Sequence, residues 1–501
     1  ITGYTQGTLS NLDNANNAGR NDSFLSKYSS DGTRTWTKLL GSSHNELSFE
    51  ATTSSDGSVY ITGYTQGDLS NLDNASNAGD YDAFLTKYSS DGTTLWTKLF
   101  GGSSVEISSS VATASDGSVY ITGQSFNTDF GSEQNEGRYD AFLTKYSSDG
   151  TTLWTKLLGT TANDSANSVA TGSDGSVYIT GETKGTLSNL EDATNAGSAD
   201  VFLTKYSSDG TRVWTNLLGT SGFESGYGVT TSSDGSVYIT GHSRGNLSNL
   251  DNATNAGNFD AFLTKFTSDG TRVWTNLLGS AEADYSYGVA TTSDGSIIIT
   301  GRTYGSIDNQ TFAGGVDIFV TKYSSDGTKG WTKLIGGALD ENSKNVAVAS
   351  DGSIYLTGTS NSADLGGKTN INQPETECYS PMMPGEEEEC FERGTNSAFL
   401  LKLAQAIAAS STSTTLHTEW VQPYAAMQNV GLKSIHNNRD LVLAKAGECN
   451  NYGWVIGDTD YCVYTNVKNK VSYVNGDTTR GSYGSAVFNG SINVEKTIND
   501  K

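Results

Sequence analysis

Cysteine, proline, methionine and histidine are all scarce in this 501-residue chain, which has 4, 4, 3 and 4 of them respectively. No apolar run comes near the ~18 residues of a membrane-spanning helix, so we expect no membrane span. Basic residues are outnumbered by 55 Asp and Glu to 31 Lys and Arg, which leaves a formal charge of −24. No local basic patch offsets this charge, so nucleic acid and anionic lipid are excluded as partners, because polyanions would be repelled.

The few cysteines fall into two pairs that are close in sequence, Cys378 with Cys390 and Cys449 with Cys462. The chain has no Cys-x-x-Cys motif and its histidines are scattered, so this spacing favours two local disulfides over a zinc site. Such disulfides predict an oxidising compartment, and therefore an extracellular or cell-surface location. The alternative is four reduced thiols.

A repeat of about 60 residues fills most of the chain. Its Ile-Thr-Gly element begins at Ile1, Ile61, Ile121, Ile179, Ile239 and Ile299, and returns as Leu-Thr-Gly at Leu356. Each complete copy also has two Asp-Gly turns between short β-prone runs, for example Asp56-Gly57 before 59–62 and Asp91-Gly92 after 83–88. Asp-Gly between such runs is a strong hairpin signal. Each copy therefore predicts four short antiparallel strands, named A to D in chain order.

Four strands per repeat, without helical periodicity, predict the blades of a β-propeller. A β-solenoid is the structural alternative, but its coils stack parallel strands and do not contain tight hairpins. We therefore predict an all-β chain with a seven-bladed propeller of four-stranded antiparallel blades over 1–403. A Ser/Thr linker over 404–415 and a small β-rich C-terminal domain over 416–501 follow it.

Three strings of the repeat carry a family resemblance: Tyr-Asp-Ala-Phe-Leu-Thr-Lys-Tyr, Asp-Gly-Thr-x-x-Trp-Thr-Lys-x-x-Gly and Ser-Asp-Gly-Ser-Val-Tyr-Ile-Thr-Gly. Over about residues 1–403 the chain resembles the bacterial SBBP β-propeller repeat. The resemblance implies a seven-bladed ring of the kind found in large bacterial surface and secreted proteins. It implies no catalytic or ligand-binding residues.

Strands B and C occur seven times, whereas strands A and D occur six times each. The first blade therefore lacks strand A and the last lacks strand D. We expect 416–421 to supply the missing D strand, and the missing A strand to lie before Ile1, in a part processed off or absent. The tryptophan of each D strand, for example Trp96, is predicted to pack between blades.

An acidic residue follows the glycine at the end of every D strand by five positions: Glu46, Glu106, Asp164, Glu224, Asp284 and Glu341. Because strand A borders the central channel of a propeller, these carboxylates could form a ring near its mouth. One interpretation is that each caps backbone N–H groups or pairs with a repeat lysine. The other is a Ca²⁺ site, since Ca²⁺ prefers oxygen ligands, although no EF-hand-like spacing is present.

The sequence contains no recognisable catalytic constellation or phosphate loop. The long B–C loops lie on one face with the D–A connections, and loops of this kind favour binding. The leading hypothesis is a non-enzymatic extracellular interaction or structural protein, a subunit or display module of a bacterial surface structure or adhesin, with protein partners and possible homo-oligomers. A multivalent carbohydrate-binding propeller is the alternative. A glycan-active enzyme comes third.

Overall fold

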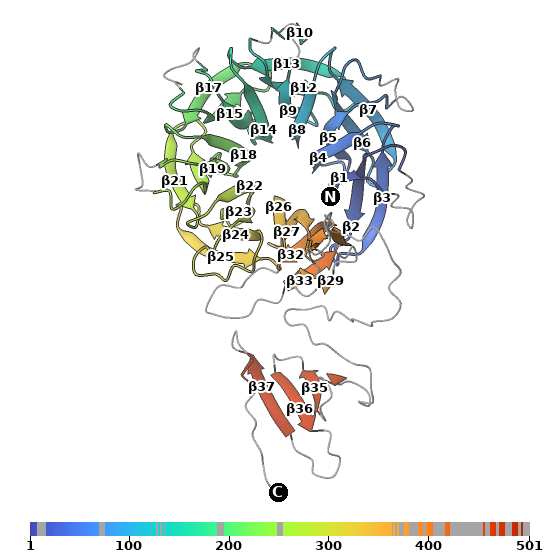
Figure 1. Cartoon of the computed structure of the whole chain (residues 1–501), viewed down its shortest axis with the longest axis vertical. Helices are drawn as coiled ribbons and strands as arrows, with labels where there is room; N and C mark the ends of the chain where they lie inside the picture. The colour runs from blue at the N-terminus through green and yellow to red at the C-terminus, as the bar shows by residue number, and fades with distance from the viewer. Residues whose placement is uncertain are drawn as a thin grey trace, which may run out of the picture. The chain divides into compact units, whose positions relative to one another are not determined.

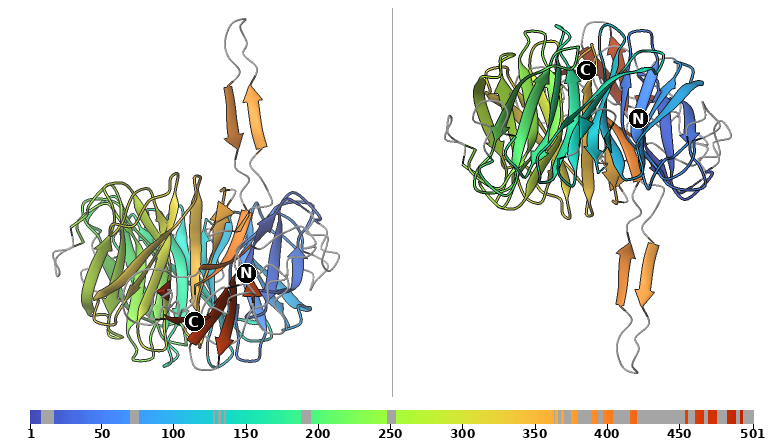
Figure 2. Two further views of the ribbon diagram at one scale, coloured as in Figure 1. Left: turned by 90° about the horizontal axis from the view of Figure 1, so that it is seen from below. Right: turned by 90° about the horizontal axis from the view of Figure 1, so that it is seen from above.

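The computed structural model describes residues 1–7, 17–69, 76–126, 136–187, 195–247, 254–362 and 397–403, together with short strands elsewhere. Seven small antiparallel sheets stand around a central axis like the blades of a propeller (Figure 1). Figure 2 views the ring edge-on, with the strands of each blade running between its two faces. The described residues contain no helix, and none is therefore long and apolar enough to cross a membrane.

Blades one to four contain the following strands: β1 (Thr2–Thr5), β2 (Asp22–Tyr28) and β3 (Arg34–Leu40); β4 (Glu46–Thr53), β5 (Val59–Thr65), β6 (Asp82–Tyr88) and β7 (Thr94–Phe100); β8 (Glu106–Thr113), β9 (Val119–Ser125), β12 (Asp140–Tyr146) and β13 (Thr152–Leu158); β14 (Asp164–Thr171), β15 (Val177–Thr183), β16 (Asp200–Tyr206) and β17 (Arg212–Leu218). Blades five to seven contain β18 (Glu224–Thr231), β19 (Val237–Ser243), β20 (Asp260–Phe266) and β21 (Arg272–Leu278); β22 (Asp284–Thr291), β23 (Ile297–Thr303), β24 (Asp317–Tyr323) and β25 (Lys329–Ile335); β26 (Glu341–Val348), β27 (Ile354–Ser360), β32 (Ser397–Leu403) and β33 (Leu416–Trp420).

Short hairpins lie between these strands: β10 (Asp129–Phe130) with β11 (Glu133–Gln134), β28 (Asp364–Leu365) with β29 (Lys368–Thr369), and β30 (Glu375–Tyr379) with β31 (Glu389–Arg393). A separate five-stranded sheet belongs to the C-terminal region and consists of β34 (Trp454–Val455), β35 (Tyr461–Asn466), β36 (Lys470–Asn475), β37 (Tyr483–Phe488) and β38 (Ile492–Asn493). Its strands follow chain order, as in a meander.

The seven-bladed, four-stranded architecture predicted from the repeats is confirmed. Blade one has three strands, in the order β1-β2-β3, as the strand count predicts. In blade seven, β33 completes the sheet in the order β26-β27-β32-β33, which confirms the D strand expected at 416–421. That strand lies inside the range assigned to the C-terminal domain, so the propeller extends past the expected end at residue 403. The predicted linker over 404–415 lies outside the described residues.

In blades two to seven, the glycine of the Ile-Thr-Gly or Leu-Thr-Gly element is explained by a bulge in the neighbouring strand A. In blade three the register of β8 with β9 shifts between Ser108 and Ser110. This shift brings the Ile107 carbonyl oxygen to 1.9 Å from the point where a Cβ on Gly123 would lie. Only a residue without a side chain fits under that carbonyl. The glycine of the motif is therefore a steric requirement of the hairpin formed by strands A and B, here called the inner hairpin of each blade.

The hydrophobic core is divided among the seams between blades. In the seam between blades two and three, Tyr60, Leu85 and Trp96 pack with Phe142 of the next blade. The Trp96 side chain is 8% exposed, and its ring lies 3.1 Å from the position of a Cβ on Gly150, a turn glycine of blade three. The prediction that the repeat tryptophans pack between blades is therefore confirmed for this seam.

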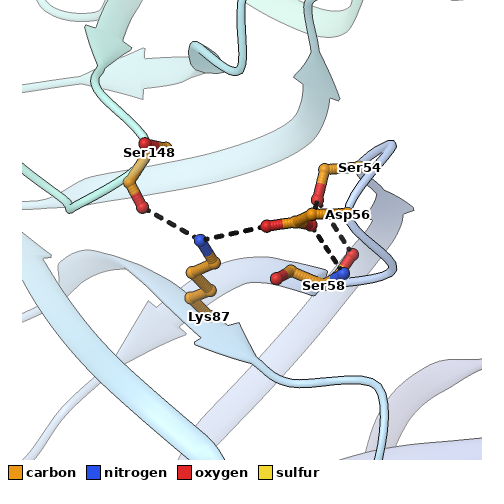
Figure 3. Close-up of polar contacts among 5 residues, drawn as sticks. All are labelled: Ser54, Asp56, Ser58, Lys87 and Ser148. Atoms are coloured by element: carbon orange, nitrogen blue, oxygen red, sulfur yellow. Dashed lines mark hydrogen bonds and ion pairs between the residues drawn. The ribbon is translucent and has the colours of Figure 1, made fainter.

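In six of the seven blades a lysine from strand C reaches across the seam to the C–D turn of the next blade, whereas Lys322 of blade six bonds Asp294 of its own blade. Figure 3 shows Lys87, whose Nζ donates to the Ser148 carbonyl at 3.1 Å and lies 3.8 Å from Asp56 Oδ2 of its own blade. The same ammonium group lies 5.3 Å from the centroid of the Tyr60 ring. In the last blade, Lys402 Nζ donates to the Ser30 carbonyl of blade one at 3.1 Å. The ring is thus closed by the same contact that joins five of its six internal seams.

Replacing Lys402 with methionine is expected to lower the free energy of unfolding by about 1 kcal/mol, because one hydrogen bond from a charged donor is lost. The matched control is Lys205→Met, which removes the equivalent bond to Ser268 inside the ring. Urea unfolding of both variants measures the effect. A loss at Lys205 with none at Lys402 would mean that blades seven and one do not meet in solution.

Candidate binding surface on the inner strands

Residues at a few inner positions differ from blade to blade, although most of the repeat hardly changes. The residue after the glycine of strand B is Tyr4, Tyr64, Gln124, Glu182, His242, Arg302 or Thr359. The second residue of strand A is Leu47, Ile107, Ser165, Ser225, Tyr285 or Asn342, and the fourth is Phe49, Ser109, Asn167, Tyr227, Tyr287 or Lys344. Side chains that pack between blades must be alike in every copy. The positions that differ between blades are therefore not needed for packing one blade against the next.

These variable positions lie together at one end of each inner hairpin. In blade six, for example, Tyr285 and Arg302 are direct cross-strand partners. Tyr285 is near the start of strand A and Arg302 near the end of strand B, next to the D–A and B–C connections. The variable positions therefore surround the inner mouth of the face that carries the long loops. This is the face that the long B–C loops predicted for binding. The loop segments themselves, at 8–16, 70–75, 188–194 and 248–253, lie outside the described residues.

Blades five and six place seven rings in one connected group, here called the aromatic cluster: Phe223, Tyr227, His242, Phe259, Tyr285, Tyr287 and Tyr304. The His242 and Tyr285 ring centroids are 4.8 Å apart, and those of Tyr227 and Tyr287 are 5.2 Å apart. These are normal distances for edge-to-face aromatic pairs. Tyr304 at the edge of the cluster is 38% exposed, so the cluster reaches the solvent.

Arg302 lies among three tyrosines of the aromatic cluster. Its guanidinium carbon is 4.8 Å from the ring centroid of Tyr285, 5.6 Å from that of Tyr304 and 5.8 Å from that of Tyr287. Its Nε is buried without a hydrogen-bond partner, and no described residue forms an ion pair with the guanidinium. The Lys344 ammonium lies 4.6 Å from the centroid of the Tyr287 ring, and burial together with the Arg302 charge lowers the pKa of Lys344. Two cations therefore meet on this surface without an acid between them.

His242 is the buried centre of the aromatic cluster, with a side-chain exposure of 5%. Burial, with a smaller effect from the Arg302 charge, lowers its pKa to about 4. The imidazole is therefore neutral at pH 7 and packs as an aromatic ring. Sequence reasoning passed over His242, Tyr285 and Arg302. The available signal was the departure of each from the residue at the same place in the other copies.

The six predicted acids all begin inner strands and are all buried, with exposures of 0–1%. Glu46, for example, accepts hydrogen bonds from the Ser42 backbone N–H at 2.6 Å and from the Thr65 hydroxyl at 2.8 Å. Asp164 accepts the Thr160 N–H at 2.7 Å in the same way. Each acid holds the D–A connection of its own seam, as the capping interpretation expects. In the described part of the chain, no three His, Cys, Asp or Glu side chains lie close enough together to hold a metal ion. The Ca²⁺ site therefore stays a prediction.

A second buried acid, missed in the sequence, begins strand C in six blades: Asp22, Asp82, Asp140, Asp200, Asp260 and Asp317. In the seam after blade two, a Cβ on Gly101 would lie 2.4 Å from Asp82 Oδ1 and 2.8 Å from Glu106 Oε2, so both carboxylates meet at this glycine. Burial, aided by the neighbouring Asp164 charge, raises the pKa of Asp140 to about 6. Burial likewise raises the pKa of Asp284 to about 6.

These pKa values predict that the propeller is more stable near pH 4 than at pH 7. A carboxyl group whose pKa rises on folding stabilises the fold while protonated, and this contribution is lost as pH rises towards 6. The carboxyl group of Asp91, in a C–D turn, affects stability in the opposite direction, because the Ser89 hydroxyl and the Thr93 N–H lower its pKa to about 2. Its contribution is lost only as pH falls below about 4.

Thermal unfolding from pH 3 to pH 8 measures this dependence. The lowered pKa of His242 acts in the opposite direction, because the neutral buried imidazole stabilises the fold as pH rises from 4 to 6.5, and it offsets about one of the two carboxyl groups. We expect a net loss of about 1–3 kcal/mol in unfolding free energy between pH 4 and pH 7. The double variant Asp140→Asn and Asp284→Asn should lose less over that interval. Stability that rises steadily from pH 4 to pH 7 in the parent chain would contradict the assignment.

The cysteine predictions fall on sparsely described parts of the chain. Cys378 and Cys390 are direct cross-strand partners in the β30–β31 hairpin. Directly opposed residues in antiparallel strands have Cα atoms about 4.5–5.5 Å apart, which lies within the range of disulfides. Cys462 lies in β35, whereas Cys449 lies outside the described residues. Both disulfides stay predictions.

Comparison with known proteins agrees with the fold. A family model described as "Beta-propeller repeat", SBBP, matches residues 153–187 and 330–366. At these two sites the chain contains SBBP β-propeller repeats. The first match begins in β13, which is strand D of blade three, and ends beyond β15, which is strand B of blade four. One family unit therefore crosses the seam between two blades. The resemblance noted in the sequence is therefore confirmed for these repeats.

Two curated proteins match the SBBP-repeat chain over part of their length. The regulatory protein FlaEY of Caulobacter vibrioides is 29% identical over 272 residues, which cover 49% of this chain and 28% of that protein. An uncharacterised WD repeat-containing protein of Acanthamoeba polyphaga mimivirus is 22% identical over 57% of this chain and 27% of its own length. The chain thus spans less than a third of each of these relatives.

Among solved structures, the Pan2 WD40 domain of Neurospora crassa aligns with a TM-score of 0.39 and 10% identity, over 68% of this chain and 80% of that one. A protein from Lactobacillus plantarum aligns with a TM-score of 0.36 and 9% identity, over 87% and 94%.

Proposed function

We propose that this SBBP propeller is a non-enzymatic interaction module, acting outside the cell or at its surface, and that it binds its partner through the aromatic cluster. The observation that carries the proposal is the contrast within the repeat. Scaffold positions keep the same residues, while the variable inner positions supply four of the seven rings of the aromatic cluster, Tyr227, His242, Tyr285 and Tyr287. Partly exposed clusters rich in tyrosine and arginine are typical of binding hot spots.

The acidic pairs of the seams favour a binding role over catalysis. Glycoside hydrolysis by two carboxylates requires that both reach the substrate. The acids at the seams, such as Asp82 and Glu106, are 0–1% exposed and lie against backbone. Their repetition in six seams fits a structural role in each blade. These observations support a module that binds without changing its ligand.

A carbohydrate-binding propeller is the second candidate, and the aromatic cluster favours it. Tyrosine rings have an apolar face and a polar hydroxyl, so they contact a sugar ring and its hydroxyl groups together. A protein partner or a second copy of the chain would use the same surface. Sugar binding and self-association separate these ligands by direct measurement.

The test applies the labelled full chain to a glycan array and, in parallel, follows its self-association by sedimentation with and without Ca²⁺. We expect a saturable interaction in at least one measurement, weakened about tenfold by Tyr287→Ala. The matched control is Phe49→Ala, at the same repeat position in blade two and 46% exposed. Equal effects of the two variants would contradict binding by the aromatic cluster. Glycans recovered with altered mass would contradict the non-enzymatic role.

A further inference from the structure

We propose that Arg302 and the tyrosines around it bind the carboxylate of an acidic sugar, such as a uronate residue of an extracellular glycan. This inference rests on the proposed function and specifies the ligand of the same surface. It starts from the unusual position of one cation. In a chain with 55 acidic and 31 basic residues, the Arg302 guanidinium has no acidic partner among the described residues.

The contacts of Arg302 leave it ready for an anion. Three tyrosine rings, with centroids 4.8–5.8 Å from its guanidinium carbon, hold the side chain by cation–π contacts. These contacts satisfy none of the N–H donors, and the buried Nε has no hydrogen-bond partner. The planar guanidinium fork matches a carboxylate in two parallel hydrogen bonds. Lys344, whose ammonium group lies 4.6 Å from the centroid of the Tyr287 ring, adds a second positive charge.

The surrounding rings favour a sugar as the carrier of that carboxylate. Tyr285, Tyr287 and Tyr304 surround the cation, and Tyr304 is 38% exposed at the edge. A carboxylated pyranose has its anion directly on a rigid ring, so one unit can reach Arg302 and cover a tyrosine face. The carboxylate of a glutamate or aspartate side chain is attached to only one or two flexible methylene groups. It would satisfy the guanidinium and leave the tyrosine rings uncovered.

The experiment is a ligand-observed NMR titration of the full chain with two sugars that share one ring. Methyl β-D-glucuronide has the carboxylate, and methyl β-D-glucoside has a hydroxymethyl group in its place. Because hydrogen bonds to charged groups contribute strongly, we expect the glucuronide to bind at least about tenfold more tightly. Arg302→Gln should remove the preference. The control Arg138→Gln, which changes an exposed arginine stacked on Phe126 and Tyr139 in blade three, should retain it.

Further ligands identify the source of the anion. Acetate and N-acetylglutamate amide should bind at least about tenfold more weakly than the glucuronide, because neither covers a ring. Equal binding of N-acetylglutamate amide would overturn the sugar assignment in favour of an acidic peptide. Should Arg302→Gln fail to fold, Tyr304→Ala provides the second test at an exposed position. It should weaken glucuronide binding and retain the preference over the glucoside, and unchanged affinity would overturn the proposal.

The outcomes distinguish this inference from the proposed function. Equal affinity for both sugars, with binding weakened by Tyr287→Ala, would overturn the carboxylate assignment and leave the aromatic cluster as the binding surface. Binding unaffected by both Arg302→Gln and Tyr287→Ala would overturn both proposals.

Discussion

Alanine at Gly123 is expected to lower the free energy of unfolding by at least about 3 kcal/mol, or to prevent folding. A Cβ there would lie 1.9 Å from the Ile107 carbonyl oxygen and 2.9 Å from the Ser108 Cα. Both atoms are backbone, so no side chain can rotate away, and relief would require the bulge between Ser108 and Ser110 to open. Opening it would disturb the inner hairpin and the seam that it lines. Urea unfolding followed by far-ultraviolet circular dichroism measures the loss.

The matched control is the same substitution at Gly172, in the A–B turn of blade four. Ala114 and Ala349 already occupy the corresponding position in blades three and seven. The contact that a Cβ would meet first is the Asp174 carboxylate at 2.7 Å, the mobile end of a side chain. We expect a change within about 1 kcal/mol, in the stabilising direction if the loss of backbone freedom in the unfolded chain dominates. Similar losses at Gly123 and Gly172 would refute the steric explanation.

Alanine at Phe142 is expected to destabilise the propeller by about 3–5 kcal/mol. Phe142 is fully buried, and it packs in the seam with Tyr60, Leu85 and Trp96 of blade two. Its ring centroid is 5.3 Å from that of Phe100. Truncation leaves a cavity between two rigid sheets, which cannot both move inward to fill it. Chemical denaturation of purified variant and parent measures the difference.

Phe126→Ala is the control within the same blade, because Phe126 is 39% exposed and lies against Arg138 and Tyr139. Its loss should cost less than about 1 kcal/mol, as for most surface substitutions. Comparable losses at Phe142 and Phe126 would mean that the blade seam does not hold the core. Gly123 and Phe142 together test the two contacts that define the blade, one within the inner hairpin and one between neighbours.

Strand positions and turns were predictable because their signals are local. Asp116-Gly117 and Asp149-Gly150 each mark a tight turn, and both glycines have positive φ, 82° and 85°. The β-prone runs beside them need only their immediate partners to form hairpins. The missing D strand of blade seven was predictable too, because 416–421 repeats the pattern of strand D around Trp420. A periodic sequence therefore revealed the number of blades and the two incomplete repeats.

The candidate site was only partly predictable. The face was expected from loop lengths, but the sequence drew attention to the acids at Glu46 and its equivalents, which lie buried against backbone. The aromatic cluster was missed because its members are spread over 82 positions, from Phe223 to Tyr304, and each looks ordinary in its own strand. Comparing copies position by position exposes them, since His242 and Arg302 stand where other blades have tyrosine, glutamine, glutamate or threonine.

The sequence by itself determined the all-β class, the blade count and the place of each hairpin, because turn chemistry and strand alternation act between residues that are close in the chain. Only the tertiary structure decided which residues meet across the seams. There Lys402 reaches Ser30, the acids Asp82 and Glu106 meet at one glycine, and Arg302 lies among tyrosines with no acid beside it. These neighbours come from different strands or blades, and only the register of the strands and the closure of the ring bring them together.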